Sequence, residues 1–321
     1  MTGMPDLFSV VIVTWNSASF IEACLEAVFR QAKVRTEVIV VDNGSTDDTP
    51  ELLQKWENRI KPIFCGENLG FCRACNLGLD RANGGYVIFL NADTIMEPDY
   101  LAAISRAFRQ NGKAGLIGGK LFRFDGKTLD SCGQILSRGR KVIDRGYGRP
   151  DRGHYEKTEK VFSVCGAALS CKRALIQELQ AEGAFFDEDF HSFYEDLDIG
   201  WRASRCGWEA LYVPTAIARH FRGGTENRKS GWLSRLGQTA RRDKNIKIHI
   251  MKNRYLVMLK NDTPREVLKN FPFILGREVK LWSFYLLTSP SLALEFWRSR
   301  RLWKKALQKR RALTARRKGT D

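Results

Sequence analysis

The sequence predicts an α/β fold with a doubly wound, mostly parallel sheet, followed by a basic helical C-terminal extension. Strand-like runs of β-branched residues alternate with segments of helical periodicity through the first half of the chain, which is the pattern of successive βαβ units. These strand-like runs are apolar throughout, as expected of strands buried on both faces. We therefore expect an α/β domain over residues 1–240, with a loop or hairpin insertion at 124–160, and a helical region over 241–321.

The predicted elements follow one another in a regular order. Phe8–Trp15 is a continuous β-branched run, and Asn16–Gln31 then shows apolar residues at helical spacing behind a capping Asn or Ser. Strands are expected within 36–45, 61–66, 86–94 and 208–220, helices within 46–56, 70–82, 195–206 and from about 245 onward, and a strand followed by a helix within 161–176.

Composition narrows the class of protein and its partners. The chain has 321 residues, 43% hydrophobic content and a formal net charge of +17, which implies an anionic partner such as a nucleotide, a nucleic acid or an anionic lipid. Eight scattered cysteines do not form the framework of a small secreted domain, so a reducing cytoplasm is expected. We expect no signal peptide and no membrane span, because 281–297, the most apolar late run, contains Pro290 and Glu295.

Polar residues follow the predicted strands where each strand ends. In doubly wound sheets, ligands bind beyond the carboxyl ends of the strands, so these groups should converge on one crevice. They are Thr14–Asn16, Asp42–Ser45, Glu67–Asn68 and Asn91–Asp93.

Two of these residues are acids with a possible role in binding. Asp93 is a hard oxygen ligand at the end of a central strand, suited to Mg²⁺ or Mn²⁺, although it also fits as a cap for the helix that follows. Asp42 precedes Asn, Gly and Ser, so a turn former is the alternative to a binding role. Their shared position at strand ends favours function for both.

The segment "SFYEDLDIGWRASRCGW" gathers three carboxylates at the start of a predicted helix. Glu195, Asp198 and Arg202 fall on one face, where Asp198 and Arg202 pair at i, i+4. Asp196 points away from them and has no charged partner at helical spacing, and Gly200 is expected to leave space beside it. Asp196 is therefore the candidate general base, with an ordinary acidic first helical turn as the alternative.

The last segment is basic and aromatic. Lys and Arg alternate with Trp and Leu through residues 281–318, which is typical of a helix lying on an anionic membrane surface. A solvated basic helix is one alternative, and phosphate-directed nucleic-acid binding is a less favoured one.

Taken together, the stretches "VVIVTWN", "VVDNGSTDDT", "NLGFCRACNLGL", "FLNADT", "FYEDLDIGWRASRCGW" and "HFRGGT" resemble family 2 glycosyltransferases in order and spacing, and most closely the bacterial rhamnosyltransferase-like branch. The resemblance implies a Rossmann-like GT-A fold, a nucleotide-diphosphate sugar donor, a divalent cation and inversion. It implies that Asp196 is the base, that Asp93 binds the metal, and that His220 lies near the diphosphate and is a possible metal ligand. Without the resemblance, a satisfied structural histidine is the favoured interpretation of His220. Asn91 occupies the place of the first acid in the DxD-type metal motif, which weakens one ligand.

The remaining expected site residues fall into two groups. Glu195, Asp198 and Arg202 are expected either to contact the acceptor or to support the base Asp196 without contacting the substrate. The residues expected to bind the donor nucleotide are Thr14, Asn16, Asp42, Asn43, Asn68, Phe71 and Asn91.

The function expected from this resemblance is a hexosyltransferase-type reaction. A sugar, with rhamnose among the candidates, would pass to a hydroxyl of a lipid-linked saccharide during cell-surface polysaccharide synthesis. The protein would be cytoplasmic and peripheral on the inner face of the cell membrane. The alternatives are a nucleotide-sensing protein that binds membrane or nucleic acid without turnover, and a sugar nucleotidyltransferase.

Overall fold

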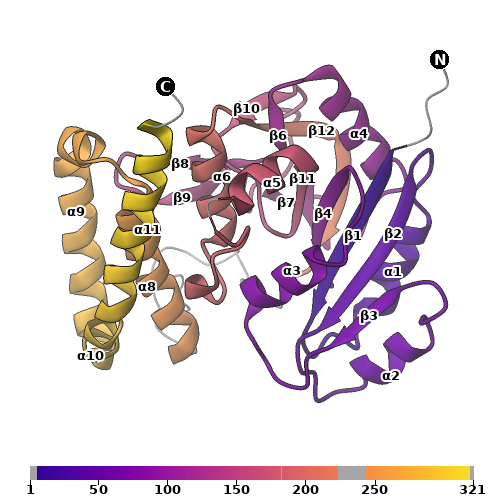
Figure 1. Ribbon diagram of the computed structural model, residues 1–321, viewed down its shortest axis with the longest axis horizontal. Coiled ribbons are helices and arrows are strands. Elements are labelled where there is room, and N and C mark those ends of the chain that lie inside the picture. Colours follow the sequence, from indigo (N-terminus) through magenta and orange to yellow (C-terminus); the bar gives the residue numbers. More distant parts are fainter. Residues whose placement is uncertain (1–5, 182, 223–242, 319–321) are drawn as a thin grey trace. The chain divides into compact units, whose positions relative to one another are not determined.

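The computed structural model describes residues 6–181, 183–222 and 243–318, the last seven of them by their backbone alone. The chain divides into two compact units (Figure 1). The first unit comprises the described residues within Met1–Ile135, Asp144–His191 and Glu195–Gly223. The second comprises those within Leu136–Ile143, Ser192–Tyr194 and Gly224–Asp321.

The first unit is built on a ten-stranded sheet, whose main path runs β10-β12-β6-β11-β4-β1-β2-β3, with β5 beside β12 and β7 beside β6. These strands are β1 (Leu7–Thr14), β2 (Arg35–Asp42), β3 (Lys61–Phe64), β4 (Tyr86–Asn91), β5 (Thr94–Met96), β6 (Ala114–Arg123), β7 (Leu129–Ser131), β10 (Glu159–Val161), β11 (Ala168–Lys172) and β12 (Glu209–His220).

The predicted parallel arrangement holds for β1, β2, β3 and β4 and for the β6–β12 pair. Strand β11 departs from it, because it lies antiparallel to both β4 and β6. Parallel neighbours need a crossover connection, usually a helix. The chain between β6 and β11 contains no helix, so it returns in the opposite direction and the sheet is mixed.

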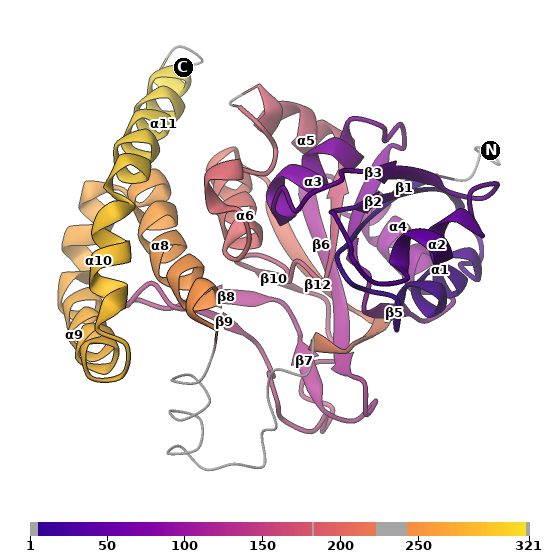
Figure 2. The same cartoon turned by 90° about the horizontal axis from the view of Figure 1, so that it is seen from below.

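Helices cover both faces of this sheet (Figure 2). Residues from α1 and α4 pack with Phe8, Val10 and Ile12 of β1. Helix α3 covers the other face, where a side chain at Gly78 would meet Val11. The helices of this unit are α1 (Ile21–Phe29), α2 (Thr49–Gln54), α3 (Phe71–Leu79), α4 (Tyr100–Gln110), α5 (Arg173–Gln180) and α6 (Glu195–Arg205), with a 3-10 turn, η1, at Glu188–Phe190.

The predicted insertion is built from short strands. β7 and β10 extend the main sheet, while β8 (Gln134–Leu136) and β9 (Val142–Asp144) form a separate two-stranded sheet. The turn between β8 and β9 groups with the second unit.

The second unit is helical, as the sequence predicted. Its helices are α8 (Lys244–Asn261), α9 (Pro264–Thr288), α10 (Ser291–Arg298) and α11 (Arg300–Lys318). Asp243 caps α8, and Thr263 and Glu266 form a capping box at the start of α9. Among the helices that the structure describes, none combines the length and the apolar character needed to cross a membrane.

The cysteines of the first unit serve packing. All eight thiols in the chain are free, and both members of the Cys72–Cys75 pair are buried. Burial raises the pKa of both thiols well above the usual range, so they stay protonated and inert.

The predicted Asp198–Arg202 pair forms inside the first unit. Arg202 Nε lies 2.9 Å from Asp198 Oδ2, and the two side chains are only 3% and 1% exposed. Arg202 Nη2 also donates to the carbonyl of Phe185. The pair therefore fixes α6 against the loop that precedes it.

Substituting Asp198→Ala should lower the free energy of unfolding by about 3–5 kcal/mol, because it leaves the Arg202 guanidinium buried without its counter-charge. Glu26→Ala is the matched control, since Glu26 pairs with Arg30 at the same i, i+4 spacing with side chains 56% and 60% exposed. The control should cost at most about 0.5 kcal/mol. Urea unfolding of both variants measures the contrast, and equal losses would contradict it.

Candidate functional site

The carboxyl ends of β1 and β2 bring Thr14 and Asp42 together. The two residues stand opposite each other in the parallel register, and Thr14 Oγ1 donates to Asp42 Oδ1 at 3.1 Å. Ser45 adds its hydroxyl to Oδ1 at 2.5 Å and its backbone N–H to Oδ2 at 3.2 Å. Asp42 is buried, and these donors hold its carboxylate in one orientation.

Three asparagines support the loops at this edge. Asn16 Oδ1 accepts from Thr46 N at 2.8 Å. Asn43 Nδ2 donates to Asn68 Oδ1 at 3.1 Å. Between these residues, Gly44 has φ +77° and passes so close to the Glu67 backbone that an added Cβ would lie 2.5 Å from it. A side chain at Gly44 would separate the two loops, so glycine is required here.

Phe71 lies at the start of α3, next to the Asn68 loop. Its ring meets Phe186 edge to face, with the centroids 6.3 Å apart. This contact packs the Phe71 ring against the segment before η1, and the expected role of Phe71 in donor binding stays a prediction.

Asp93 and His220 meet beyond β4 and β12. His220 Nε2 lies 3.3 Å from Asp93 Oδ1, and Nδ1 lies 2.9 Å from Asp130 Oδ2. Asn91 Nδ2 lies 3.5 Å from the same Nε2. Although burial opposes protonation, the hydrogen bonds to Asp130 and Asp93 raise the pKa of His220 to about 9.

Three further residues extend this cluster, and no sequence pattern indicated them. Asp130 is fully buried and accepts from Arg222 Nε, whose Nη2 reaches Asp144 at 3.0 Å. Asp130 and Asp144 stand in the short strands β7 and β9, within a Gly- and Arg-rich stretch that has no periodicity to mark a buried acid. Arg222 was visible in the "HFRGGT" stretch, but nothing in that stretch identified its partners.

Asp196 lies in the first turn of α6 and is held by three donors. Its Oδ2 accepts from Gln134 Nε2 at 2.8 Å and from Gly166 N at 3.0 Å, and its Oδ1 accepts from Leu197 N at 2.7 Å. Burial, followed by the charge of Asp144, raises the pKa of Asp196, while the hydrogen bonds oppose that rise. Gln134 is a second contact that the sequence analysis missed, because 62 residues separate it from Asp196.

Asp196 and the metal-site candidates belong to one continuous group of residues. Asn91 N donates to Ala167 O at 3.0 Å, and the adjacent Gly166 N donates to Asp196. A Cβ at Gly166 would lie 3.5 Å from the Asp196 Cβ. The end of β4 and the start of α6 are therefore both hydrogen-bonded to the segment Gly166 and Ala167.

The other acids of α6 are placed differently. Glu195 is close to Gly166, with Oε1 3.5 Å from the Cβ position of that glycine. Asp198 and Arg202 are buried and neutralise each other, so they act behind the site as a structural pair. The space expected beside Gly200 is not there, because an added Cβ would lie 2.3 Å from the Ser163 hydroxyl, which already donates to the Asp196 carbonyl.

The residues around Asp93 fit a divalent cation that also binds phosphate oxygens. No group of three His, Cys, Asp or Glu side chains able to hold a metal occurs within the described part of the chain. Mg²⁺, however, is usually held by one or two carboxylates together with substrate phosphates. Asp93 supplies a carboxylate. His220, with its pKa raised to about 9, is protonated at neutral pH and bridges Asp93 and Asp130, so it would bind a metal only after releasing the proton from Nε2.

A family model and a curated relative both relate this chain to glycosyltransferases. Residues 9–179 match the family model described as glycosyl transferase family 2. The chain is 28% identical over 250 residues to N-acetylglucosaminyl-diphospho-decaprenol L-rhamnosyltransferase of Mycobacterium tuberculosis, covering 70% of this chain and 79% of the relative.

Two solved structures are similar in fold. GalNAc-T7 with UDP, GalNAc and Mn²⁺ matches with a TM-score of 0.58 at 15% identity, covering 80% of this chain and 49% of that one. Mannosyltransferase PcManGT from Pyrobaculum calidifontis, in complex with GDP-Man and Mn²⁺, matches with a TM-score of 0.54 at 18% identity, covering 98% and 87%. The fold is accordingly GT-A-like, as the sequence predicted.

The contacts of Asp196 predict opposite pKa changes in two variants. Gln134→Met removes a donor that favours the ionised carboxylate, so the pKa of Asp196 should rise. Asp144→Asn removes a like charge, so the pKa should fall. NMR titration of the Asp196 side-chain carboxyl in each purified variant measures both, and shifts of the same sign would contradict this account of the site.

Proposed function

Because the chain belongs to glycosyl transferase family 2, we propose that it is an inverting glycosyltransferase that moves a sugar from a nucleoside-diphosphate donor to a hydroxyl of a lipid-linked saccharide. Rhamnose is the donor sugar that the mycobacterial relative suggests. The observation that carries the proposal is the continuity of Asn91, Asp93, His220 and Asp196 at the carboxyl edge of the sheet. This edge is where ligands bind in open α/β sheets.

The loops after β1 and β2 provide the site for the donor nucleotide. The Asp42 carboxylate is fixed by Thr14 and Ser45 and is suited to accept hydrogen bonds from a nucleobase. In this proposal the hydrogen-bonded pair Asn43 and Asn68 adjoins the base, and Phe71 follows at the start of α3. Binding the base here leaves the diphosphate to extend toward the ends of β4 and β12.

Asp93, with His220 beside it, would hold a divalent cation, Mg²⁺ or Mn²⁺, together with the donor diphosphate. When bound, such a cation neutralises the negative charge that grows on the leaving nucleoside diphosphate. Asp130 orients the His220 ring, and Arg222 in turn neutralises Asp130. These contacts fix the ring before the donor arrives.

Asp196 is the proposed general base. Its carboxylate takes the proton from the acceptor hydroxyl as that oxygen attacks the anomeric carbon from the side opposite the diphosphate, which gives inversion without a covalent intermediate. Burial makes the carboxylate a stronger base, and its three donors keep it ionised and aligned. One carboxylate is sufficient for this chemistry.

The acceptor and the location of the protein follow from the second unit. The M. tuberculosis relative is named for a diphospho-decaprenol substrate, which supports a lipid-linked acceptor for this chain. Leu268, Leu275 and Val279 of α9 are 49–78% exposed, and exposed Arg and Lys side chains occupy α11. Exposed apolar residues next to cations favour an anionic membrane surface, and we place the protein on the inner face of the cell membrane. Cell-surface polysaccharide synthesis is the process that such an acceptor suggests.

Asp196→Asn should lower kcat by about 10²–10⁴-fold while the donor dissociation constant changes little, because the amide retains the shape of the side chain but takes up no proton. Release of nucleoside diphosphate and calorimetric donor binding, each with Mn²⁺ or Mg²⁺ present, provide the two readouts. Asp80→Asn, at an exposed acid outside the site, is the control. Unchanged turnover would exclude Asp196 as the base, and incorporation of a nucleoside monophosphate into product would indicate a nucleotidyltransferase instead.

Replacing the exposed pair Arg301 and Lys304 of α11 with Gln should weaken binding to phosphatidylglycerol vesicles about 30-fold, since each surface cation contributes about 1 kcal/mol to binding. The control replaces Lys55 and Arg81, two exposed cations of the first unit. Vesicle flotation at low salt measures both double variants. An equal loss in the control, or no loss in either, would refute the proposed membrane contact through residues 281–318.

A further inference from the structure

A cavity in the second unit lies between the β8–β9 turn and α9. Its volume is about 660 Å³, within the range of small-molecule sites. The described lining residues combine apolar side chains with cations, and none of them is a carboxylate; they are Ser137, Gly139, Lys141, Ile143, Pro272, Phe273, Gly276, Arg277, Lys280, Leu281 and Phe284. We call this cavity the α9 groove.

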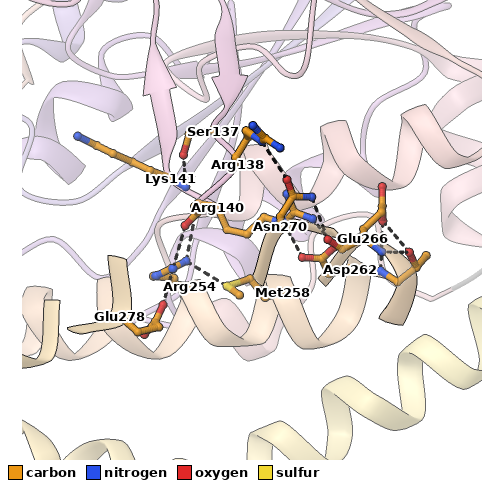
Figure 3. Close-up of polar contacts among 12 residues, drawn as sticks. Ser137, Arg138, Arg140, Lys141, Arg254, Met258, Asp262, Glu266, Asn270 and Glu278 are labelled. Atoms are coloured by element: carbon orange, nitrogen blue, oxygen red, sulfur yellow. Dashed lines mark hydrogen bonds and ion pairs between the residues drawn. The ribbon is translucent and has the colours of Figure 1, made fainter. Parts of the chain in front are cut away.

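The turn that forms one wall of the α9 groove is held rigidly. Arg254 is 2% exposed and donates to the carbonyls of Gly139 and Arg140 at 3.1 and 3.0 Å (Figure 3). Arg140, at φ 60°, forms a two-point contact with the buried Asp262, with Nη2–Oδ1 at 2.8 Å. The wall therefore exists before any ligand binds, which lowers the cost of binding.

The opposite wall is one face of α9. Phe273, Leu281 and Phe284 supply apolar surface, and Arg277 and Lys280 stand among them. Figure 3 shows that the Lys141 side chain extends away from the Arg140–Arg254 contacts. Cations therefore enter the groove from both the turn and the helix.

Arg277 carries the clearest sign of a missing ligand. Its Nε atom is buried and has no hydrogen-bond partner among the described residues. A buried donor without a partner costs about 1–3 kcal/mol, so an anion in the groove that accepts from it would be stabilised. Burial and the nearby charge of Arg254 also lower the pKa of Arg277, and a bound anion would reverse this effect.

We propose that the α9 groove binds the lipid anchor of the acceptor, with the phosphate at Lys141, Arg277 and Lys280 and the first part of a polyprenyl chain along Phe273, Leu281 and Phe284. This proposal rests on the proposed function. A free inorganic anion would leave the apolar wall unused, and a neutral hydrocarbon would leave the buried Nε of Arg277 without an acceptor. An amphiphile with one phosphate end satisfies both.

Gly276 offers a test that does not depend on destabilising the protein. It lines the groove, and a Cβ at this position would meet no atom within 4 Å. Gly276→Trp should therefore occupy the groove, while Gly276→Ala should leave it open. Both replace a glycine within a helix, so neither should lower the melting temperature.

The probe is decaprenyl monophosphate in phosphatidylcholine vesicles, with the full chain and co-flotation as readout. Gly276→Trp should weaken binding at least about tenfold, and Gly276→Ala should stay within about twofold of the unsubstituted protein. With phosphatidylglycerol replacing the decaprenyl lipid at equal charge, the two variants should bind alike. Equal binding of both variants to decaprenyl monophosphate, or an equal loss toward phosphatidylglycerol, would overturn the proposal.

A charge variant keeps the test independent of the tryptophan. Arg277→Gln with Lys280→Gln should weaken decaprenyl monophosphate binding about tenfold or more, whereas Arg265→Gln with Lys269→Gln, at exposed cations elsewhere on α9, should change it less than about twofold. Equal losses from the two double variants would show that only the overall charge of the helix matters, and would overturn the proposal.

Failure of the groove and failure of the proposed enzyme are distinguishable. Groove variants should keep the kcat of the unsubstituted protein with a soluble saccharide lacking a lipid, and should raise KM only for the lipid-linked acceptor. If the unsubstituted protein transfers sugar to neither acceptor, the proposed function fails, while the binding ratio between Gly276→Trp and Gly276→Ala still decides the groove.

Discussion

The parallel pairing of β1 with β2 and β4 is the constraint on which the candidate site depends. Its register places Thr14 opposite Asp42 and Val13 opposite Asn91. Because parallel strands end at the same edge, chain segments nearly 80 residues apart deliver their polar ends to one place. A slip of one residue would turn Asp42 to the other face of the sheet. Alternate side chains of β1 pack against α1 and α4 on one face and against α3 on the other, and this specific packing fixes the register and with it the geometry of the polar edge.

Ion pairs between a buried acid and an arginine then fix segments outside the main path of the sheet. Asp198 holds Arg202, Asp130 holds Arg222, and Asp262 holds Arg140. A buried pair contributes little net stability, because desolvation cancels much of the attraction. What each pair contributes is position. Arg202 also donates to the carbonyl of Phe185, and the carbonyl of Arg140 accepts from Arg254.

The sequence predicted the features that arise from local spacing. Helix α6, its Asp198–Arg202 pair and the polar strand ends all follow from residues within one element, and each lies where predicted. The residues that it did not predict are those that act through contacts between positions far apart in the sequence. Gln134 and Asp144 act on Asp196 from strands of three residues each, and such strands carry no periodic signal. Two other differences also arise from contacts between distant parts of the chain. Ser163 fills the space expected beside Gly200, and β11 runs antiparallel to β4.

The β8–β9 hairpin carries both the residues that adjust the proposed base and the turn that lines the α9 groove. Gln134 opens β8 and donates to Asp196, while Asp144 closes β9 and raises the pKa of the same carboxylate. Between them, Ser137 and Lys141 close the turn through the hydrogen bond from Lys141 N to Ser137 Oγ. The Gln134 backbone is itself fixed, since its N–H donates to Ser163 O at 2.8 Å and its carbonyl accepts from Phe162 N at 2.9 Å. The backbone of Gln134 is therefore anchored by hydrogen bonds of its own, which are separate from the hydrogen bond that closes the turn.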